Sequence, residues 1–309
     1  MMKTSAMGFL FVIHLTASAQ ISGDVSLDYG RDEIQIFERE GSEIAYLDTG
    51  SGDPMLFIHG AFSDYRVWMH QTEAFRSERR VISYSNRTSY PNPPSQDTVL
   101  AKQMAWDETS DAIALLDFFN IDSAVLVAHS AGGGVAINMA LQRPDLVQAL
   151  VLVEPAVIVM PPVTETSGSS GVFFPLPMIE AFTKIEIGEV EAGVRQFLDF
   201  ASGPGYFDSQ SPNAQRIIID NAYSGMVGTG PAPGRAHVLP TLPPNYCEIV
   251  SDLAMPVLYV AGEVSPQPDT ISHCFSSAQK ITVEGASHGV FFEEPAEFNR
   301  VLQSFLRGL

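Results

Sequence analysis

A serine stands where an apolar run gives way to a stretch of small residues. The run Val125-Leu-Val-Ala-His129 is followed by Ser130-Ala-Gly-Gly-Gly134. Small residues let a strand and a helix approach closely around a sharp turn, which lifts the serine hydroxyl above the sheet edge. The helix N-terminus behind it directs unpaired N–H groups at the reacting oxygen. The pattern therefore indicates a serine nucleophile, with a serine N-cap in a glycine-rich turn as the non-catalytic alternative.

A nucleophilic serine needs a base and a group that orients that base. His288, in Ser287-His288-Gly289 after the last apolar run, is the candidate base. Glu154 follows the apolar run 149–153 and lies 154 − 130 = 24 residues after Ser130, which leaves room for one helix and one strand. In a parallel sheet this spacing brings Glu154 to the same edge as Ser130. Glu154 is the preferred acid, with Glu263 and Asp269 as alternatives.

Apolar runs and amphipathic segments alternate along much of the chain. Strand–helix alternation predicts a doubly wound α/β sheet, mostly parallel, with helices on both faces. The alternation stops between residues 156 and 245, where helical patterns lie between proline-rich loops, and this insertion predicts a helical lid. The predicted strands cover residues 44–47, 55–58, 81–84, 124–128, 149–153, 257–260 and 281–283.

From about Ile34 to Leu309 the chain resembles the α/β-hydrolase superfamily. The Ser130 segment is similar to its nucleophile elbow G-x-S-x-G, with Ala128 in place of the first glycine. The resemblance implies an eight-stranded sheet with the lid after strand 6, and His288 as the base. It extends to a serine hydrolase subgroup through the segments 85–92, 152–155, 203–205 and 220–222.

The resemblance also implies an oxyanion hole. In this family His-Gly after the third strand begins the oxyanion loop, and here His59-Gly60-Ala61-Phe62 has that place. The N–H groups of Ala61 and Ala131 would hold the oxyanion, with Phe62 as the alternative donor. His59 is expected to brace the loop.

One position departs from the family pattern. Many members carry the triad acid in Gly-x-x-Asp after strand 7, where this chain has Gly262-Glu-Val-Ser265. A serine thus replaces the aspartate, which favours the acid after strand 6.

The predicted reaction is cleavage of a carboxylic ester or lactone by acyl transfer to water. A serine nucleophile argues against epoxide hydrolase and haloalkane dehalogenase chemistry, which use aspartate in this fold. Hydrolysis of a carbon–carbon bond and peracid formation are the enzymatic alternatives, and a ligand-binding protein without catalysis is the alternative outside enzymes. No cofactor or metal is predicted.

The predicted substrate is small to medium in size and largely apolar. Each aromatic candidate for the pocket wall has core or lid packing as its alternative. Arg87 is a candidate for binding a carboxylate, with a surface role as its alternative. The pocket candidates are Phe62, Tyr65, Trp68, Phe173 and Phe182.

The first residues predict export. Lys3, the apolar stretch 7–15 and Ala17-Ser-Ala19 match a signal peptide cleaved after Ala19, which predicts a secreted or periplasmic protein. The stretch is too short to span a bilayer, so no stable membrane anchor is expected. The predicted units are residues 1–19 as signal peptide, 20–155 as the first part of the core, 156–245 as the lid and 246–309 as the second part.

The 309 residues carry a net charge of −19, which disfavours binding to nucleic acid or anionic lipids. In an exported protein Cys247 and Cys274 could pair, with two separate buried thiols as the alternative. No CxxC motif or Cys/His cluster in the sequence suggests zinc.

Overall fold

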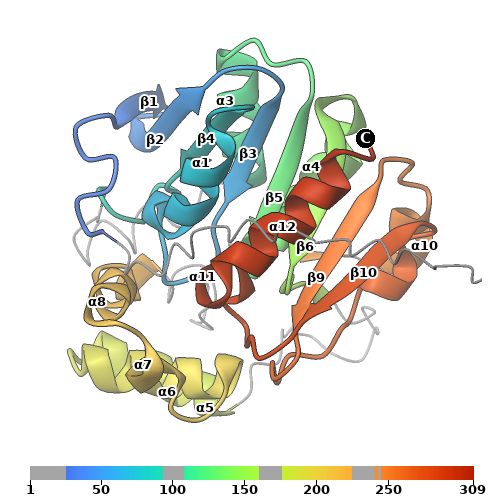
Figure 1. Ribbon diagram of the computed structural model, residues 1–309. Helices are drawn as coiled ribbons and strands as arrows, with labels where there is room; N and C mark the ends of the chain where they lie inside the picture. The colour runs from blue at the N-terminus through green and yellow to red at the C-terminus, as the bar shows by residue number, and fades with distance from the viewer. Residues whose placement is uncertain (1–25, 93–107, 160–175, 225–240, 243–244) are drawn as a thin grey trace, which may run out of the picture.

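An eight-stranded sheet forms the centre of the computed structural model, which describes residues 26–92, 108–159, 176–224, 241–242 and 245–309 (Figure 1). The strands lie in the order β1-β2-β4-β3-β5-β6-β9-β10. Strand β2 runs antiparallel to β1 and β4, and all other neighbours are parallel. The predicted mostly parallel, eight-stranded fold is therefore confirmed. The strands are β1 (Gln35–Arg39), β2 (Ser42–Gly50), β3 (Pro54–Ile58), β4 (Arg80–Tyr84), β5 (Ala124–His129), β6 (Val147–Val153), β9 (Val257–Gly262) and β10 (Ala278–Val283).

Seven of these strands contain an apolar run that the sequence predicts, and only β1 was missed. Strand β1 lies at the sheet edge and pairs only with β2. Its side chains are mostly exposed or half-buried, and Ile36 is 44% exposed. A strand that buries little apolar surface has no strong pattern to reveal it.

Helices cover both faces of the sheet, because alternate residues of each strand point to opposite sides. Leu56 and Leu126 pack on the side of α3, α4 and α10. Phe57 and Val127 pack on the side of η1, α1, α11 and α12, where α12 crosses in front of the sheet in Figure 1. The covering elements are η1 (Tyr65–Trp68), α1 (Met69–Phe75), α3 (Glu108–Phe118), α4 (Ala131–Gln142), η2 (Pro144–Leu146), α10 (Tyr246–Ser251), η3 (Ser272–Cys274), α11 (Val290–Glu293) and α12 (Pro295–Leu306).

Helices α5 to α8 follow β6 in the sequence and form a separate layer at the carboxyl ends of the parallel strands (Figure 1). We call them the inserted helices: α5 (Leu176–Glu186), α6 (Val190–Ser202), α7 (Tyr206–Ser209) and α8 (Pro212–Asp220). Helices α5 and α6 pack through Phe182, Val194 and Phe197, and Phe62 of the sheet domain joins this cluster. The short strands β7 (Ile158–Val159) and β8 (Thr241–Leu242) pair in parallel at the two ends of the insertion.

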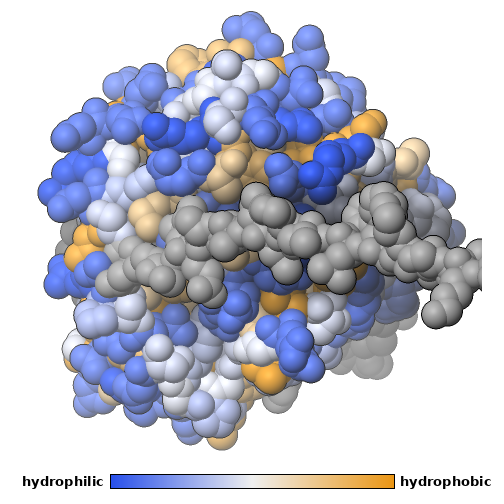
Figure 2. All heavy atoms as spheres, viewed as in Figure 1, coloured by the Kyte–Doolittle hydropathy of each residue, from blue (hydrophilic) through white to orange (hydrophobic). Residues whose placement is uncertain are grey.

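Hydrophilic residues predominate on the face shown in Figure 2, and hydrophobic residues appear there as separated patches. Of the eight large hydrophobic side chains that are exposed in the described chain, four belong to the region of α5 and α6: Leu176, Ile179, Ile187 and Phe200. None of the helices described is long and apolar enough to cross a membrane. The predicted signal peptide lies outside the described residues.

A disulfide joins Cys247 in α10 to Cys274 in η3, with their Cα atoms 4.6 Å apart. His273 Nε2 lies 3.6 Å from each of the two sulfur atoms. These three residues thus form a group whose ligand atoms lie within 4.8 Å of one another. No Cys/His cluster could be recognised in the sequence, because α10 and η3, which carry these residues, meet only in the fold. The bond between the sulfurs leaves no thiolate for a metal.

Candidate active site

Ser130 occupies the sharp turn between β5 and α4, with φ 49° and ψ −120°. The turn is held by Ser130 N–H, which donates to Val153 O at 3.0 Å, and by Gly133 N–H, which donates to Ser130 O at 2.9 Å. A Cβ at Gly132 would lie 2.6 Å from the carbonyl oxygens of Ile58 and His59. A side chain there would therefore force β3 away from the helix, which is why the predicted elbow needs small residues.

Backbone strain concentrates at this edge of the sheet. Five residues other than glycine have a positive φ in the described chain, and three of them are Phe62, Ser130 and Glu154. Each of the three follows the carboxyl end of a parallel strand, where active sites of such sheets form. Such conformations persist only where the surrounding structure enforces them, and they are common at functional sites.

The loop after β3 packs directly against the Ser130 turn. A Cβ at Gly60 would lie 3.0 Å from Ser130 Cβ and 2.9 Å from His129 Nδ1. His59 bridges the loop, because its Nδ1 lies 2.7 Å from Gly60 O and its Nε2 accepts from Asn86 N–H at 3.1 Å. Burial lowers the pKa of His59, which favours this neutral, bridging form. The loop thus lies against the Ser130 turn, and Ala61 in it is half-buried.

His288 meets Glu154 across the ends of the sheet. His288 Nδ1 lies 3.2 Å from Glu154 Oε2. The Glu154 carboxylate also accepts from Gly262 N–H at 2.9 Å and from the Ser265 hydroxyl at 2.6 Å. Glu154 is only 5% exposed, so its carboxylate depends on these protein groups in place of solvent water. The structure therefore places beside His288 the carboxylate that the sequence analysis preferred.

The two alternative acids have other partners. Glu263 is exposed and accepts from Gly285 N–H at 3.0 Å. Asp269 accepts from Lys280 Nζ at 2.6 Å and from the Ser272 hydroxyl. Burial raises the pKa of Asp269, but the hydrogen bonds from Lys280 and Ser272 outweigh it and lower this pKa to about 2. Neither carboxylate contacts His288.

His129 is a neighbour of the site, and its place beside Ser130 in the sequence led to no predicted catalytic role for it. Its Nε2 lies 3.0 Å from His288 O, and the two rings lie 4.7 Å apart. Burial, assisted by the nearby His288, lowers the pKa of His129 well below its ordinary value, so the ring is neutral and can donate from Nε2. Its position next to Ser130 is the only signal in the sequence that could have indicated this contact with His288.

The contact with His129 brings His288 beside the Ser130 turn. Among the described residues, however, no hydrogen bond joins the His288 ring to the Ser130 hydroxyl. Within the described residues the Ser130 hydroxyl has no hydrogen-bond partner. Catalytic hydrogen bonds are often long or poorly aligned before substrate binds and tighten in the complex. The geometry therefore presents a base–acid pair and an uncommitted hydroxyl at one edge.

The predicted pocket residues lie in packed regions. Tyr65 is 1% exposed and donates from its hydroxyl to Tyr29 O at 2.8 Å. Trp68 is 0% exposed and stacks on Phe291 at 4.1 Å between ring centroids. Both are core residues, which is the alternative that the sequence left open for them.

Two other pocket candidates belong to the junction with the inserted helices. Phe62 packs on Phe197 with their ring centroids 4.6 Å apart, and Phe182 also packs on Phe197, with ring centroids 5.5 Å apart. Phe173 lies outside the described residues. Arg87 is paired with Asp111 at 2.6 Å and with Glu40 at 3.0 Å, so its charge is compensated within the protein.

The segment 85–92, one basis of the subgroup resemblance, connects the sheet domain to α8. Tyr90 N–H donates to Asn221 Oδ1 at 2.9 Å, and Asn221 Nδ2 donates to Asp64 Oδ2 at 2.7 Å. Asp64 also pairs with Arg66 at 2.7 Å. We call Asp64, Arg66, Tyr90 and Asn221 the buried junction. Asp64 and Arg66 lie just after the Gly60 loop in sequence, so the buried junction connects the inserted helices to that loop.

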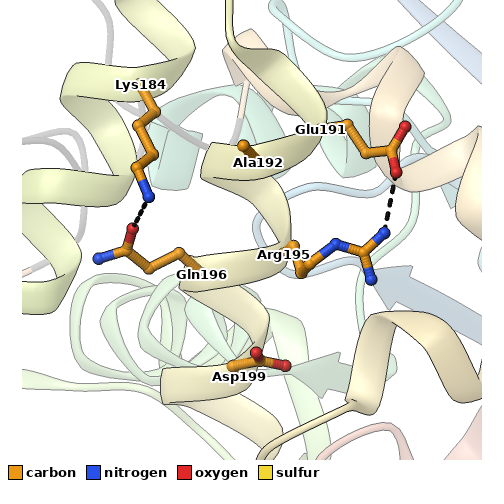
Figure 3. Close-up of a pocket in the computed structure, with 6 residues that line it drawn as sticks. All are labelled: Lys184, Glu191, Ala192, Arg195, Gln196 and Asp199. Carbon is orange, nitrogen blue, oxygen red and sulfur yellow. Dashed lines mark hydrogen bonds and ion pairs between the residues drawn. The ribbon is translucent and has the colours of Figure 1, made fainter.

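A hollow of about 600 Å³ is lined by residues of α5 and α6 (Figure 3). Its charged residues are already paired with one another or with neighbours: Lys184 donates to Gln196 at 2.6 Å, and Arg195 pairs with Glu191 at 2.8 Å. None of the candidate catalytic residues lines it.

Comparison with known proteins gives the family. The chain matches the alpha/beta hydrolase family over residues 55–301. It is 27% identical over 279 residues to the sn-1-specific diacylglycerol lipase ABHD11 of Mus musculus, covering 82% of this chain and 80% of that protein. It is also 27% identical over 285 residues to the non-heme chloroperoxidase of Streptomyces lividans, covering 87% of this chain and 97% of that protein.

Among solved structures, carboxylesterase CesB (YbfK) from Bacillus subtilis has a similar fold, with a TM-score of 0.68 at 18% identity, covering 90% of this chain and 92% of that chain. The family match spans every parallel strand of the sheet and includes Ser130, Glu154 and His288. This chain therefore belongs to the alpha/beta hydrolase family.

Proposed function

We propose that the chain is a serine hydrolase that cleaves a carboxylic ester or lactone by acyl transfer to water. The observation that carries the proposal is the 3.2 Å contact between His288 Nδ1 and Glu154 Oε2 beside the strained Ser130 turn. A nucleophile, a base and an acid that orients the base are the parts that an activated serine requires.

In the first half of the reaction, Ser130 Oγ attacks the carbonyl carbon while His288 accepts its proton. Glu154 accepts a hydrogen bond from Nδ1–H, which keeps Nε2 directed at the serine and stabilises the imidazolium. The N–H groups of Ala61 and Ala131 stabilise the oxyanion, with Phe62 N–H as the alternative donor.

Collapse of the tetrahedral intermediate breaks the ester bond, and His288 returns the proton to the leaving alkoxide. In a lactone this alcohol remains attached to the acyl group. Water then attacks the acyl-enzyme with His288 as base, which releases the acid and restores Ser130.

The proposed substrate is small to medium in size and largely apolar. Phe62, beside the proposed oxyanion donor Ala61, packs on Phe197 of α6, so the inserted helices extend the apolar surface next to Ser130. The exposed apolar side chains of α5 and α6 agree with this preference. We also propose that the inserted helices act as the lid of this site.

The experiment is a screen of nitrophenyl esters and lactones of graded length with the full chain and with Ser130→Ala. We expect turnover by the wild type and its loss in Ser130→Ala. Labelling of Ser130 by a phosphonate without turnover of any substrate would instead indicate a ligand-binding protein. Turnover that survives Ser130→Ala would rule out the proposed nucleophile.

Peracid formation is a second candidate, favoured by the relative named a non-heme chloroperoxidase. In that reaction hydrogen peroxide replaces water in the attack on the acyl-enzyme. A halogenation assay with peroxide, bromide and a carboxylic acid distinguishes the two, because a hydrolase alone gives no halogenated product. Carbon–carbon bond hydrolysis is tested in the same screen with a diketone substrate.

Export is also part of the proposal. Cleavage after Ala19, from the Ala17-Ser-Ala19 pattern, would release a protein that begins with Gln20 and is secreted or periplasmic. N-terminal sequencing of the protein from the culture medium and periplasm tests it, and an intact Met1 would contradict it.

A further inference from the structure

A single carboxylate holds the backbone on both sides of His288. Glu293 Oε2 accepts from Ser287 N–H at 2.6 Å, and Glu293 Oε1 accepts from Gly289 N–H at 2.9 Å. Hydrogen bonds from neutral donors to a carboxylate are among the stronger ones in proteins. The two oxygens of Glu293 therefore fix the direction in which the His288 side chain leaves its loop.

The inserted helices reach the same loop at two points. The Ser287 hydroxyl donates to Ser202 O, the last residue of α6, at 2.7 Å. The Tyr206 hydroxyl, from α7, lies close to the Glu293 carboxylate, since both border the same side of Gly289. Burial and the neighbouring Glu293 raise the pKa of Tyr206 well above its ordinary value, so this hydroxyl remains a donor.

Gly289 shows how closely these groups pack. A Cβ at this position would lie 2.5 Å from the Tyr206 hydroxyl oxygen and 2.8 Å from Glu293 Oε1. A side chain at this position would therefore displace the Tyr206 hydroxyl or the Glu293 carboxylate from its place beside the His288 loop. The contact between the inserted helices and the loop is therefore built into the sequence at three positions.

Together these contacts restrain His288 from three directions. Glu154 holds Nδ1, His129 lies within hydrogen-bond distance of the carbonyl oxygen, and Glu293 holds the two flanking N–H groups. Glu293 does not reach the imidazole itself, so its influence on the reaction passes through the backbone.

We propose that Glu293 is a positioning residue for the base His288, and that Tyr206 makes this positioning depend on the seating of the inserted helices. The inference rests on the proposed function, since it requires His288 to be the base.

The test compares Glu293→Gln with Glu294→Gln, its exposed neighbour, whose side chain forms no capping hydrogen bond. The amide of glutamine accepts with one oxygen and turns an N–H₂ group toward the other backbone donor. Displacement of a catalytic group by about 1 Å can cost about 100-fold in rate. We expect kcat of Glu293→Gln to fall by roughly 10-fold to 100-fold with KM within about threefold, and Glu294→Gln to match the wild type.

A second readout separates positioning from simple damage to the fold. Phosphonate labelling of Ser130 should slow in Glu293→Gln in parallel with kcat, while the fraction of molecules finally labelled stays complete. Tyr206→Phe should lower kcat by a smaller factor, and the double variant should lose less than the product of the two single effects, because both changes act on one carboxylate.

The outcomes are separable. If the wild type turns over substrate, Ser130→Ala does not, and Glu293→Gln keeps kcat within twofold of Glu294→Gln, the inference is wrong while the proposed function stands. If Ser130→Ala or His288→Ala retains activity, the proposed function itself fails. If Glu293→Gln does not fold, Tyr206→Phe decides: a lower kcat at unchanged KM supports the inference, and an unchanged kcat overturns it.

Discussion

The negative charges of two buried carboxylates in this molecule are stabilised by different kinds of partner. Asp64 in the buried junction pairs with the guanidinium of Arg66 and accepts from Asn221. Glu154 at the candidate active site accepts from two neutral donors and faces an imidazole. A guanidinium is permanently charged, whereas an imidazole gains and loses a proton near neutral pH. The first arrangement suits a fixed structural contact, and the second leaves a carboxylate that can respond to charge arising on His288.

The largest expected effect comes from removing Ser130 or His288, the proposed nucleophile and base of the candidate active site. We expect Ser130→Ala and His288→Ala each to lower kcat by a factor on the order of 10⁴ to 10⁶, since residues of such a unit act together. The melting temperature should stay close to that of the wild type, because neither change removes a buried core side chain. Steady-state kinetics and a thermal melt measure both quantities. Activity within about tenfold of the wild type in either variant would show that the site works without that residue.

Replacing the acid comes next. Glu154→Gln should lower kcat by about 10³–10⁴, by analogy with triad acids elsewhere. Glu263→Gln and Asp269→Asn are the matched controls, and we expect both to remain near wild-type activity because neither carboxylate contacts His288. The three variants are compared at equal folded concentration. Near-normal turnover by Glu154→Gln, with collapse of one control, would move the acid to the segment after β9.

The corresponding change in the buried junction should affect stability. Asp64→Asn breaks the buried pair with Arg66, a change that typically costs about 3–5 kcal/mol. Asp220 still lies 3.7 Å from the guanidinium, so the cost should fall toward the lower end of this range, about 3 kcal/mol. We expect a loss of that size in the free energy of unfolding, measured by urea denaturation. Asn221→Ala should cost less, about 1–3 kcal/mol, because it leaves the Tyr90 N–H and one hydrogen bond to the Asp64 carboxylate unmade while the Asp64–Arg66 pair stays intact. If Asp64→Asn is as stable as the wild type, the Asp64–Arg66 pair is not a structural contact in the sense that distinguishes it from the Glu154–His288 pair.

The smallest effect is a dependence of stability on pH. Burial lowers the pKa of His59, His70 and His129 in the folded protein. Below the unfolded value of about 6.5, the unfolded chain binds protons that the folded chain does not, so stability present at pH 7 is lost as the pH falls. Each histidine can contribute a slope of up to about 1.4 kcal/mol per pH unit.

Urea denaturation between pH 7 and pH 5 measures this slope. His70→Gln, which lies away from the candidate site, should flatten it by the contribution of one histidine. Arg66 should add nothing in this range, because its guanidinium remains charged throughout. A slope that is unchanged in His70→Gln would show that His70 is not held neutral by the fold.

Much of the sheet, and the meeting of Ser130 and Glu154 at one edge of it, could be predicted from the sequence. The buried strands reveal themselves as apolar runs, and a helix and a strand between Ser130 and Glu154 place both at one edge of a parallel sheet. Strand β1 escaped prediction because it buries little on either face. Tyr65 and Trp68 show a second limit, since an aromatic residue in a sequence looks the same whether it lines a pocket or packs in the core.

Contacts made through backbone atoms also could not be predicted from the sequence. His129 reaches a carbonyl oxygen and Glu293 reaches two N–H groups, and no pattern of side-chain types reports where loops direct these atoms. Ser265 could have been found in part, because a serine in the place of the usual aspartate suggested that the acid had moved. That its hydroxyl would donate to the new acid depends on the separation of β6 and β9 at their ends.

The bond between Cys247 and Cys274 has a consequence for where the protein can be made. It closes a segment with a sequence separation of 27 between α10 and η3. Cross-linking a loop of that length reduces the conformational entropy of the denatured chain, by about 3–4 kcal/mol at 25 °C in the chain-entropy model. That is a large part of the net stability of an ordinary domain, which is about 5–15 kcal/mol. The same polypeptide made in a reducing compartment would lack this contribution, so its fraction folded depends on the redox chemistry of its surroundings as well as on its contacts.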